Sequence, residues 1–496
     1  MGSWKWPESR QKVKRNARPR FLELRSSPWF ITLVVSFAGA TDVFMYGLIV
    51  PVTPTALKTR VGISEDTIQA WNSTLLALFG AALLASSPLV GHIADRSASR
   101  RWPYLCGLAS LAVTTALLCV GTNIAFWIVG RLCQGAAASV VWVVGNALLA
   151  DTVGTDGVGE VMGYTTMAAS IGIVGGPLLG GVVYENGGYY AVFGLAFGLI
   201  GLDVILRLIL IEKRHAIEWL APEEDSSQGN QQGTELSEAG KVSAGSLANS
   251  PDLINDPDSR APAPETASLG AFGRVRVLLS MPRVLVSLWG TFVVSIILTS
   301  FDSVLPLFVQ ETFGWKQSGQ GLIFIPLMIP HILSPVTGSF VDRFPRASRY
   351  MTAGAFLFSL PVLVLLRLVT HNSMPQKVLL CALLSLVGIC LAIVLPPLDA
   401  EVFHAVDEKE KQVPGIFGKG GAVALAFGLT NMGFATGSLV GPFLAGFIRQ
   451  NAGWGTMGWV LGLVTGVSSL PILFFMGGWI LREPIVSEEH VATITS

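Results

Sequence analysis

Long runs of apolar residues, separated by short polar or charged segments, fill almost the whole chain. A helix needs roughly 20 predominantly apolar residues to cross the hydrocarbon core of a bilayer. Twelve runs reach that length and are predicted to be membrane-spanning helices: 30–52, 69–91, 103–121, 124–150, 161–184, 189–211, 284–310, 318–341, 350–370, 377–402, 422–448 and 456–481. The pattern therefore predicts an all-α membrane protein with twelve transmembrane helices.

One polar interruption is much longer than the others and divides the chain. Residues 212–283 lack the apolar residues that a folded core requires, so we expect a flexible cytoplasmic linker. The linker separates an N-terminal six-helix half, 29–211, from a C-terminal six-helix half, 284–481. Residues 1–28 are predicted to form a basic cytoplasmic arm, and residues 482–496 a cytoplasmic tail.

Composition and charge placement support this topology. Hydrophobic residues make up 51% of the chain and charged residues only 13%, about half the usual share in soluble proteins. Lys and Arg in short loops remain on the cytoplasmic side of a membrane. Most of the 33 such residues lie in the arm, in the linker and in the loops at 95–101, 342–349 and 403–421. Both termini are therefore predicted to be cytoplasmic.

The two predicted halves repeat each other's motifs. The segment 91–96 (GHIADR), after the second span, recurs as 338–343 (GSFVDR) after the eighth. The segment 176–181 (GPLLGG) in the fifth span recurs as 441–446 (GPFLAG) in the eleventh. Two motifs in the same order at corresponding spans indicate a duplicated architecture, which is typical of transporters with one path between two repeats.

These motifs resemble the major facilitator superfamily, and the resemblance covers the chain outside its termini and linker. It implies two pseudo-symmetric six-helix halves and a cytoplasmic gate at the repeated loops. On physical grounds, Asp95 can pair with Arg96 or Arg100, or it can face the N-terminus of a neighbouring helix. The alternative is a basic turn that only sets topology. The gating candidates are Gly91, Asp95, Arg96, Arg100, Asp151, Gly338, Asp342 and Arg343.

The fifth predicted span carries a cluster of small residues and a proline. Small residues at helical spacing let two helix backbones approach closely, and a proline removes one backbone hydrogen bond and kinks a helix. The cluster is similar to a motif associated with antiporters of the superfamily, which implies exchange of solutes. Its members are Gly172, Gly176, Pro177, Gly180 and Gly181.

Asp42 is the most informative residue of the first span. An ionised carboxylate in mid-bilayer costs roughly 3 kcal/mol, so such a residue normally faces a wet cavity or a partner. Structural pairing of Asp42 with Tyr46 or Asn146 is the alternative to a transport role. Because desolvation disfavours the charged form, Asp42 or Glu401 could hold either a proton or a cationic substrate.

Within the superfamily, segments 41–54, 298–307 and 401–420 resemble the drug/proton antiporters, particularly fungal relatives of the vesicular amine transporters. The resemblance implies that Asp42 receives a substrate ammonium and that acids in helices ten and eleven couple protons. Glu401, or alternatively Asp399, stands in the tenth predicted span. The eleventh predicted span has Asn431 instead of an acid. Asp42 is therefore expected to carry more of the proton coupling than the corresponding residue of the amine transporters does.

Two further charges lie inside predicted spans. Arg131 has no neutral form and needs acceptors in the membrane. Segment 130–135 is similar to a second motif of the superfamily, which implies that Arg131 takes part in proton coupling or ion pairing, and the alternative is that it reaches the outer surface. Asp302 could bind a proton or substrate as Asp42 does, or it could lie in a partly hydrated turn that breaks the helix. Asn146 and Asn431 complete the set of candidates for substrate binding or proton coupling.

The function predicted from the sequence is proton-coupled export of small amphipathic or cationic organic molecules, as in multidrug efflux. No phosphate-binding loop is present, and the 5 cysteines have neither metal-site nor disulfide spacing. We therefore expect no enzyme activity, no metal and no cofactor beyond the proton gradient. The expected partners are substrate, protons and lipid, without nucleic acid, and the protein is expected to be a monomer in the plasma membrane or a vacuolar or vesicular membrane. A facilitator of a neutral solute and a non-transporting sensor are the alternatives.

Overall fold

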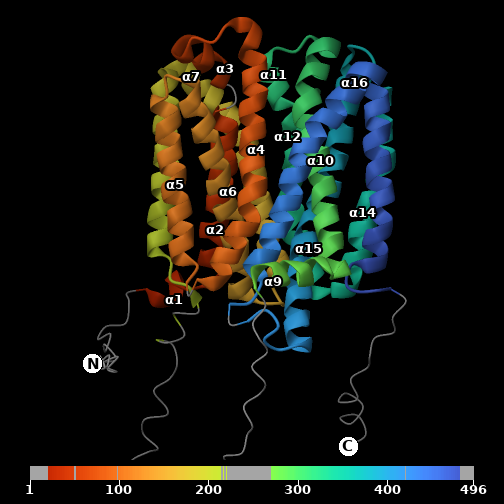
Figure 1. Ribbon diagram of the computed structural model, residues 1–496. Coiled ribbons are helices and arrows are strands. Elements are labelled where there is room, and N and C mark those ends of the chain that lie inside the picture. The colour runs from red at the N-terminus through yellow and green to blue at the C-terminus, as the bar shows by residue number, and fades with distance from the viewer. Residues whose placement is uncertain are drawn as a thin grey trace, which may run out of the picture.

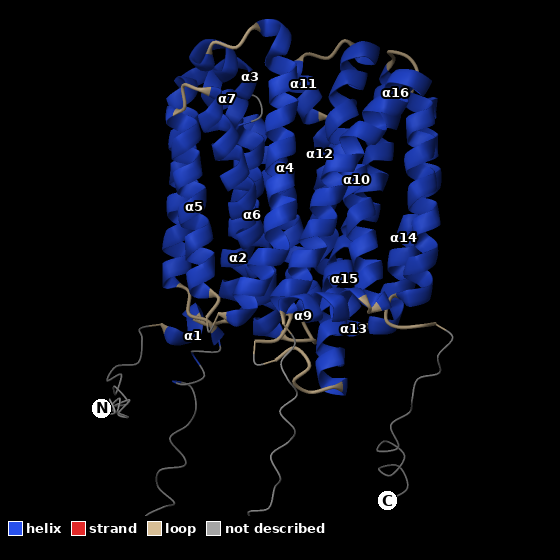
Figure 2. Cartoon of the chain, in the orientation of Figure 1, coloured by secondary structure: helices blue, strands red, loops and turns tan. Residues whose placement is uncertain are grey.

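Long helices, roughly parallel to one another, form the body of the protein (Figure 1). The computed structural model describes residues 21–49, 52–97, 99–213, 216, 219, 270–418 and 420–480. Those residues contain helices and loops but no strand (Figure 2). Most of the predicted arm, most of the linker and the predicted tail lie outside the described residues.

The helices follow the predicted spans closely. The N-terminal half contains α1 (Leu22–Arg25), α2 (Pro28–Ile49), α3 (Thr53–Ala56), a π-helical turn (Leu57–Val61), α4 (Glu65–Arg96), α5 (Arg101–Val120), α6 (Ile124–Val153) and α7 (Val158–Ile209). The second part contains α9 (Ala271–Leu279), α10 (Pro282–Phe313), α11 (Gln317–Leu322), α12 (Phe324–Met328), a 3-10 turn (Ile329–Leu333), α13 (Ser334–Arg343), α14 (Pro345–Leu365), a second 3-10 turn (Leu366–Leu368), α15 (Met374–Gln412) and α16 (Val423–Phe475).

Among the described residues, 10 helices are long and apolar enough to cross a membrane. Two of them are about twice the usual length, because α7 and α16 contain 52 and 53 residues. Each has a glycine with non-helical dihedrals inside it, Gly188 with φ 74° and Gly453 with φ 83°, where two helices join at a kink. Divided at these glycines, the bundle is compatible with the twelve predicted spans.

The two halves stand side by side, with α4 of the first half packed against α16 of the second where they meet (Figure 1). Helices α1 and α9 lie at one end of the bundle, which we call the α1 end, and α3 lies at the other, the α3 end. The start of α2, which follows α1 directly in the chain, and the end of α16 also lie at the α1 end (Figure 1).

Helices α7 and α2 of the N-terminal half pack closely against each other. A Cβ atom at Gly176 would lie 2.6 Å from the Phe44 carbonyl oxygen, and one at Gly180 would lie 2.7 Å from that of Leu48. Gly172 meets the carbonyl of Ala40 in the same way, one turn earlier. Only glycine permits this contact between backbones.

The rest of the fifth-span motif has a different environment. The Pro177 ring packs against Gly47 of α2, where a Cβ would lie 2.8 Å from its Cδ, and α7 stays helical through the proline. Gly181 has open space around it. The second half repeats the arrangement, since a Cβ at Gly441 of α16 would lie 2.7 Å from the Ile296 carbonyl oxygen of α10.

The span predicted at 318–341 differs from a single straight helix. The segment Gly319–Arg343 is long and apolar enough to cross a membrane. It is nevertheless divided into α11, α12, the 3-10 turn Ile329–Leu333 and α13. Pro330 is the second residue of the turn and Pro335 the second residue of α13. A proline cannot donate the helical hydrogen bond, so the helix is reset at each of them.

The C-terminal end of the predicted linker is folded. Residues 271–279 form α9, whose Arg274 is buried. Its guanidinium donates to the carbonyl of Gly421 at 3.0 Å and lies 2.7 Å from Nδ1 of His92. The linker helix therefore contacts both halves, because His92 belongs to α4 and Gly421 precedes α16.

Candidate transport site and gate

Asp42 lies in the middle of α2 and is buried, with an exposed fraction of 4%. At 1.5 Å per residue it is about 21 Å from the start of α2 at Pro28. The indole Nε1 of Trp142, on α6, donates a hydrogen bond of 3.0 Å to its Oδ2. Its Oδ1 is buried without a hydrogen-bond partner among the described residues. The carboxyl group therefore has one acceptor atom available for a proton or ligand.

The two residues considered as structural partners of Asp42 do not fill that role. Trp142 is its hydrogen-bond donor, in place of Tyr46 or Asn146. Asn146 lies one turn after Trp142 on α6, and its Oδ1 is also buried without a partner among the described residues. Two acceptor oxygens without donors therefore occur beside the Trp142 indole.

Arg131 is fully buried in α6, about 10 Å from the helix end at the α3 end of the bundle. It does not reach the membrane surface, because none of its side chain is exposed. Its Nη1 donates to Gln134 at 3.1 Å, while its Nε and Nη2 have no partner among the described residues. The guanidinium carbon is 6.0 Å from the ring centroid of Tyr46.

Asp302 faces the N-terminal half from α10. It lies within an unbroken helix, so the helix-breaking turn considered for it does not form. Its side chain is exposed, unlike that of Asp42. The Tyr46 hydroxyl interacts electrostatically with both Asp302 and Arg131. Tyr46 therefore lies near Arg131 of its own half and senses the charge of Asp302 from the other half.

No hydrogen bond or ion pair of the described residues joins Glu401 to Asp42. Glu401 is buried at the α1 end, where it accepts from Arg283 and, at 2.7 Å, from the amide of Gly477. Arg283 is the second residue of α10 and also binds Glu408. The charge of Glu401 is thus used to join α10, α15 and the end of α16.

Asn431 and Asp399 are the other candidates from the tenth and eleventh spans. The Asn431 amide donates to Oγ of Ser87 on α4 at 2.9 Å, so it links the two halves. Asp399 is half-buried on α15, two residues before Glu401. Neither is brought to Asp42 by a contact of the described residues.

Asp95 forms the first lock between the halves. Its Oδ1 and Oδ2 accept the amides of Ala424 and Leu425, both at 2.9 Å. These amides belong to the first turn of α16, where a helix has unsatisfied donors and a partial positive charge. Arg100 also donates to Oδ1 at 3.3 Å, and its Nε bonds Asp151 at 3.1 Å. The prediction that Asp95 faces a neighbouring helix N-terminus agrees with this geometry.

Asp342 forms the second lock, related to the first by the repeat. Its Oδ1 and Oδ2 accept the amides of Gly159 and Glu160 at 2.8 Å each, in the first turn of α7. Each half therefore places an acid on the fifth helix of the other half. Arg96 and Arg343, the basic residues next in sequence, are both exposed, and Arg100 pairs with Asp95 instead of Arg96.

The repeated glycines make these locks possible. A Cβ at Gly91 would lie 2.7 Å from Cα of Leu425, and one at Gly338 would collide with the carbonyl of Gly159. A side chain at either position would hold α4 away from α16, or α13 away from α7. Glycine is required here for a close approach between helices that belong to different halves.

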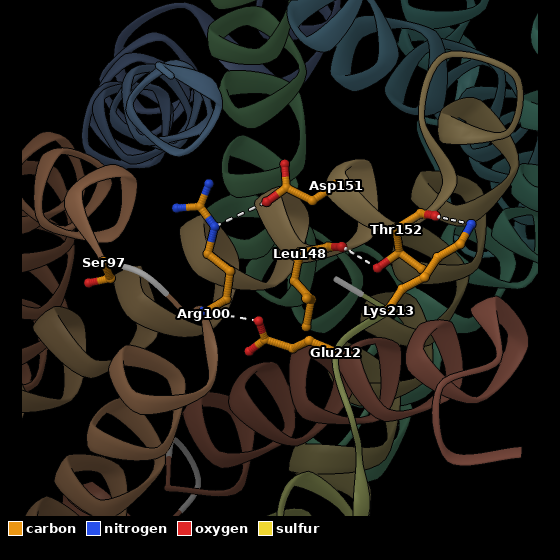
Figure 3. Close-up of a pocket in the computed structure, with 7 residues that line it drawn as sticks. All are labelled: Ser97, Arg100, Leu148, Asp151, Thr152, Glu212 and Lys213. Atoms are coloured by element: carbon orange, nitrogen blue, oxygen red, sulfur yellow. Dashed lines mark hydrogen bonds and ion pairs between the residues drawn. The ribbon is translucent and has the colours of Figure 1, made fainter. Parts of the chain in front are cut away.

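A small cavity of about 30 Å³ lies beside the first lock, at the α1 end and not at Asp42. Figure 3 shows Arg100 reaching Asp151 on one side, while its backbone amide faces Glu212. Lys213 donates to the carbonyl of Thr152 at 3.1 Å. The lock is thereby attached to the segment that follows α7.

Sequence reasoning missed one buried acid, Asp203 in the sixth span. It is 1% exposed, and neither carboxyl oxygen has a hydrogen-bond partner among the described residues. Asp203 interacts electrostatically with Asp42 and with Arg207. The same signal that singled out Asp42, an acid inside a long apolar run, was present in the sequence around it.

The fold and its inter-half locks define a multi-pass integral membrane protein of two repeated halves that meet around buried charges. The family model of the Major Facilitator Superfamily matches residues 35–418 and 332–493, and the chain belongs to this superfamily. It is therefore a membrane transporter for a small-molecule substrate and not an enzyme, as predicted. Its fold class is likewise confirmed.

Individual relatives agree with this assignment. The chain is 31% identical over 477 residues to the MFS-type transporter ppzB of Metarhizium rileyi, covering 93% of this chain and 98% of that protein. It is 21% identical to the human synaptic vesicular amine transporter, over 83% of this chain and 66% of that one. The human organic anion transporter MFSD10 has the same fold, with a TM-score of 0.62, 16% identity, and coverage of 90% of this chain and 99% of that chain.

Proposed function

We propose that this protein is a proton-coupled exporter of small cationic or amphipathic organic molecules. One observation carries the proposal: Asp42 is buried in mid-helix with one oxygen bonded to Trp142 and the other without a partner. A buried carboxylate lacking donors is costly, and a proton or an ammonium group relieves that cost. The two ligands compete, which is the requirement for exchange.

The distribution of charge supports a site between the halves. Asp42 and Tyr46 lie one helical turn apart on α2, and Asp302 of α10 interacts electrostatically with Tyr46. Acids from both halves thus face one region, which suits a cation better than an anion. The similarity to a vesicular amine transporter is consistent with a cationic substrate.

In this proposal the α1 end is cytoplasmic, because the basic loops at 95–101 and 342–349 lie there. Both locks join the halves at this end, so the described conformation is closed to the cytoplasm. Substrate leaves toward the opposite compartment when the locks hold, and it enters when they open. We place the protein in the plasma membrane or a vacuolar or vesicular membrane, and as a monomer that uses only the proton gradient.

The test is counterflow of a labelled organic cation, such as N-methyl-4-phenylpyridinium, into proteoliposomes with an imposed pH gradient. Asp42→Asn keeps the shape of the side chain and is expected to abolish the effect of the gradient. Asp156→Asn is the matched control, because Asp156 is exposed in the loop before α7. Gradient-dependent exchange that survives unchanged in Asp42→Asn would overturn the proposal, and uptake indifferent to pH in the wild type would favour a facilitator.

A further inference from the structure

A ladder of buried polar groups leads from Asp42 toward the α1 end. Asp203 of α7 and Tyr104 of α5 are both buried, and neither carboxyl oxygen of the first nor the hydroxyl of the second has a hydrogen-bond partner among the described residues. Tyr104 interacts electrostatically with Asp203 and with Asp42. The proposed transport role of Asp42 does not account for these groups.

Arg207 continues the ladder one turn after Asp203 on α7. It is fully buried, and its guanidinium carbon lies 4.7 Å from the ring centroid of Tyr104. Its Nη2 bonds Glu212 at 3.5 Å, while its Nε and Nη1 have no partner among the described residues. The guanidinium therefore holds Glu212 weakly and keeps two donors for another acceptor.

Glu212 connects Arg207 to the first lock. It accepts from Oγ of Ser99 at 3.0 Å and from the backbone amide of Arg100 at 3.3 Å. Arg100 in turn binds Asp95, which holds the first turn of α16 (Figure 3 shows Glu212 beside Arg100). A change at Glu212 would therefore reach the loop that carries the lock.

The charge state of Asp203 follows from its contacts. An ionised carboxylate without any donor in a buried site is far more costly than a neutral acid. A guanidinium one helical turn away, with two unused donors, would be the obvious partner of an ionised Asp203. Because Arg207 instead reaches Glu212, the described conformation corresponds to a protonated Asp203.

We propose that Asp203 is a second proton-binding site, and that its protonation decides whether Arg207 holds Glu212 or Asp203. With the proton bound, Asp203 is neutral and Arg207 stays with Glu212, so the lock loop is supported. When the proton leaves to water, ionised Asp203 takes the guanidinium, and Glu212 loses Arg207 while it keeps Ser99 and the Arg100 amide. The lock then opens more readily.

The groups that face this site come from every neighbouring segment. Asp42 acts from α2, Tyr104 from α5, Arg207 from α7 itself, and Arg101 and Glu212 act on Arg207 from the α1 end. The positive charge of Arg207 has a carboxylate partner in both states, because it pairs with Glu212 when Asp203 is protonated and with Asp203 when Asp203 is ionised. This inference rests on the proposed function only in assuming that protons take part in the cycle.

The test measures opening at the second lock, which must open together with the first when the halves separate, and it requires no substrate. Val158, fully buried at the start of α7 beside the second lock, is replaced by cysteine after the five native cysteines are changed to serine or alanine. The rate of maleimide labelling of this reporter is measured over a pH series. Each rate is divided by the rate of the denatured protein at the same pH, which removes the ionisation of the thiol.

The normalised rate is expected to rise with pH, by at most about tenfold per pH unit because one proton is released. Asp203→Asn mimics the neutral acid and should give a low rate at every pH. Glu212→Gln should give a raised rate at every pH, and Tyr104→Phe, which keeps the ring under Arg207, should retain the wild-type profile. A pH-dependent labelling rate that persists in Asp203→Asn would overturn the inference. This result does not depend on the counterflow experiment with Asp42→Asn, which tests the proposed function separately.

Discussion

Loss of the Asp95 charge is expected to open the first lock. Asp95→Asn leaves only one acceptor oxygen for two amides, those of Ala424 and Leu425, which now bond both carboxylate oxygens at 2.9 Å. One buried N–H group loses its acceptor, at about 1–3 kcal/mol. The remaining hydrogen bond and the contact with Arg100 are weakened because the side chain at position 95 is now neutral, which costs about 1 kcal/mol more.

The closed state is therefore destabilised by about 2–4 kcal/mol, equivalent to a roughly 30- to 700-fold shift toward the open state. The Val158→Cys reporter, which lies at the other lock, measures that shift as faster maleimide labelling. Asp407→Asn is the control, because the ion pair of Asp407 among the described residues is with the exposed Lys411, four residues later on the same helix. Labelling of Asp95→Asn at the wild-type rate would refute the assignment of the lock.

Two other substitutions separate packing from coupling. Gly176→Ala places a Cβ 2.6 Å from the Phe44 carbonyl oxygen and is expected to lower the free energy of unfolding by about 1–3 kcal/mol. Gly181→Ala is the control, because Gly181 has open space around it and the change should have little effect. Thermal unfolding in detergent measures both variants, and equal losses of stability would contradict the packing argument. Glu401→Gln removes the ion pair with Arg283 and should lower the free energy of unfolding by about 3 kcal/mol, while substrate exchange keeps its pH dependence. If counterflow instead loses its pH dependence and the stability is unchanged, Glu401 takes part in transport.

The spans, the duplication and the lock could be read from the sequence because each depends on local pattern. Apolar length determines membrane crossing, and the repeated GxxxD segments identified both Asp95 and Asp342. Their bonds to helix N-termini required only that a carboxylate at a helix end prefers such a position. The broken eighth span was missed because its prolines were not weighed against its hydropathy.

The partners of individual charges could not be predicted in the same way. Glu401 and Asp42 are both acids in apolar runs, but depth separates them: Glu401 meets Arg283 at the second residue of α10, while Asp42 is about 21 Å from the start of α2. A pairing between helices depends on which turn of each helix lies level with the other. That information comes from three-dimensional packing and not from spacing along the chain.

The distribution of strong and weak contacts indicates which parts can move. Within each half, glycine carbonyl contacts join α2 to α7 and α10 to α16, and inserting even one methyl group there would force backbones apart. Between the halves, Gly91 and Gly338 also permit close contacts, but these lie beside the two locks, where Asp95 and Asp342 hold the helix N-termini by a few hydrogen bonds each. Those bonds amount to a few kcal/mol, which is within reach of one proton or one ligand that binds the two states unequally. Opening should therefore proceed by rocking of two rigid halves, and Asp42, carried on the helix packed against α7, should move with its half and keep Trp142 as its neighbour throughout.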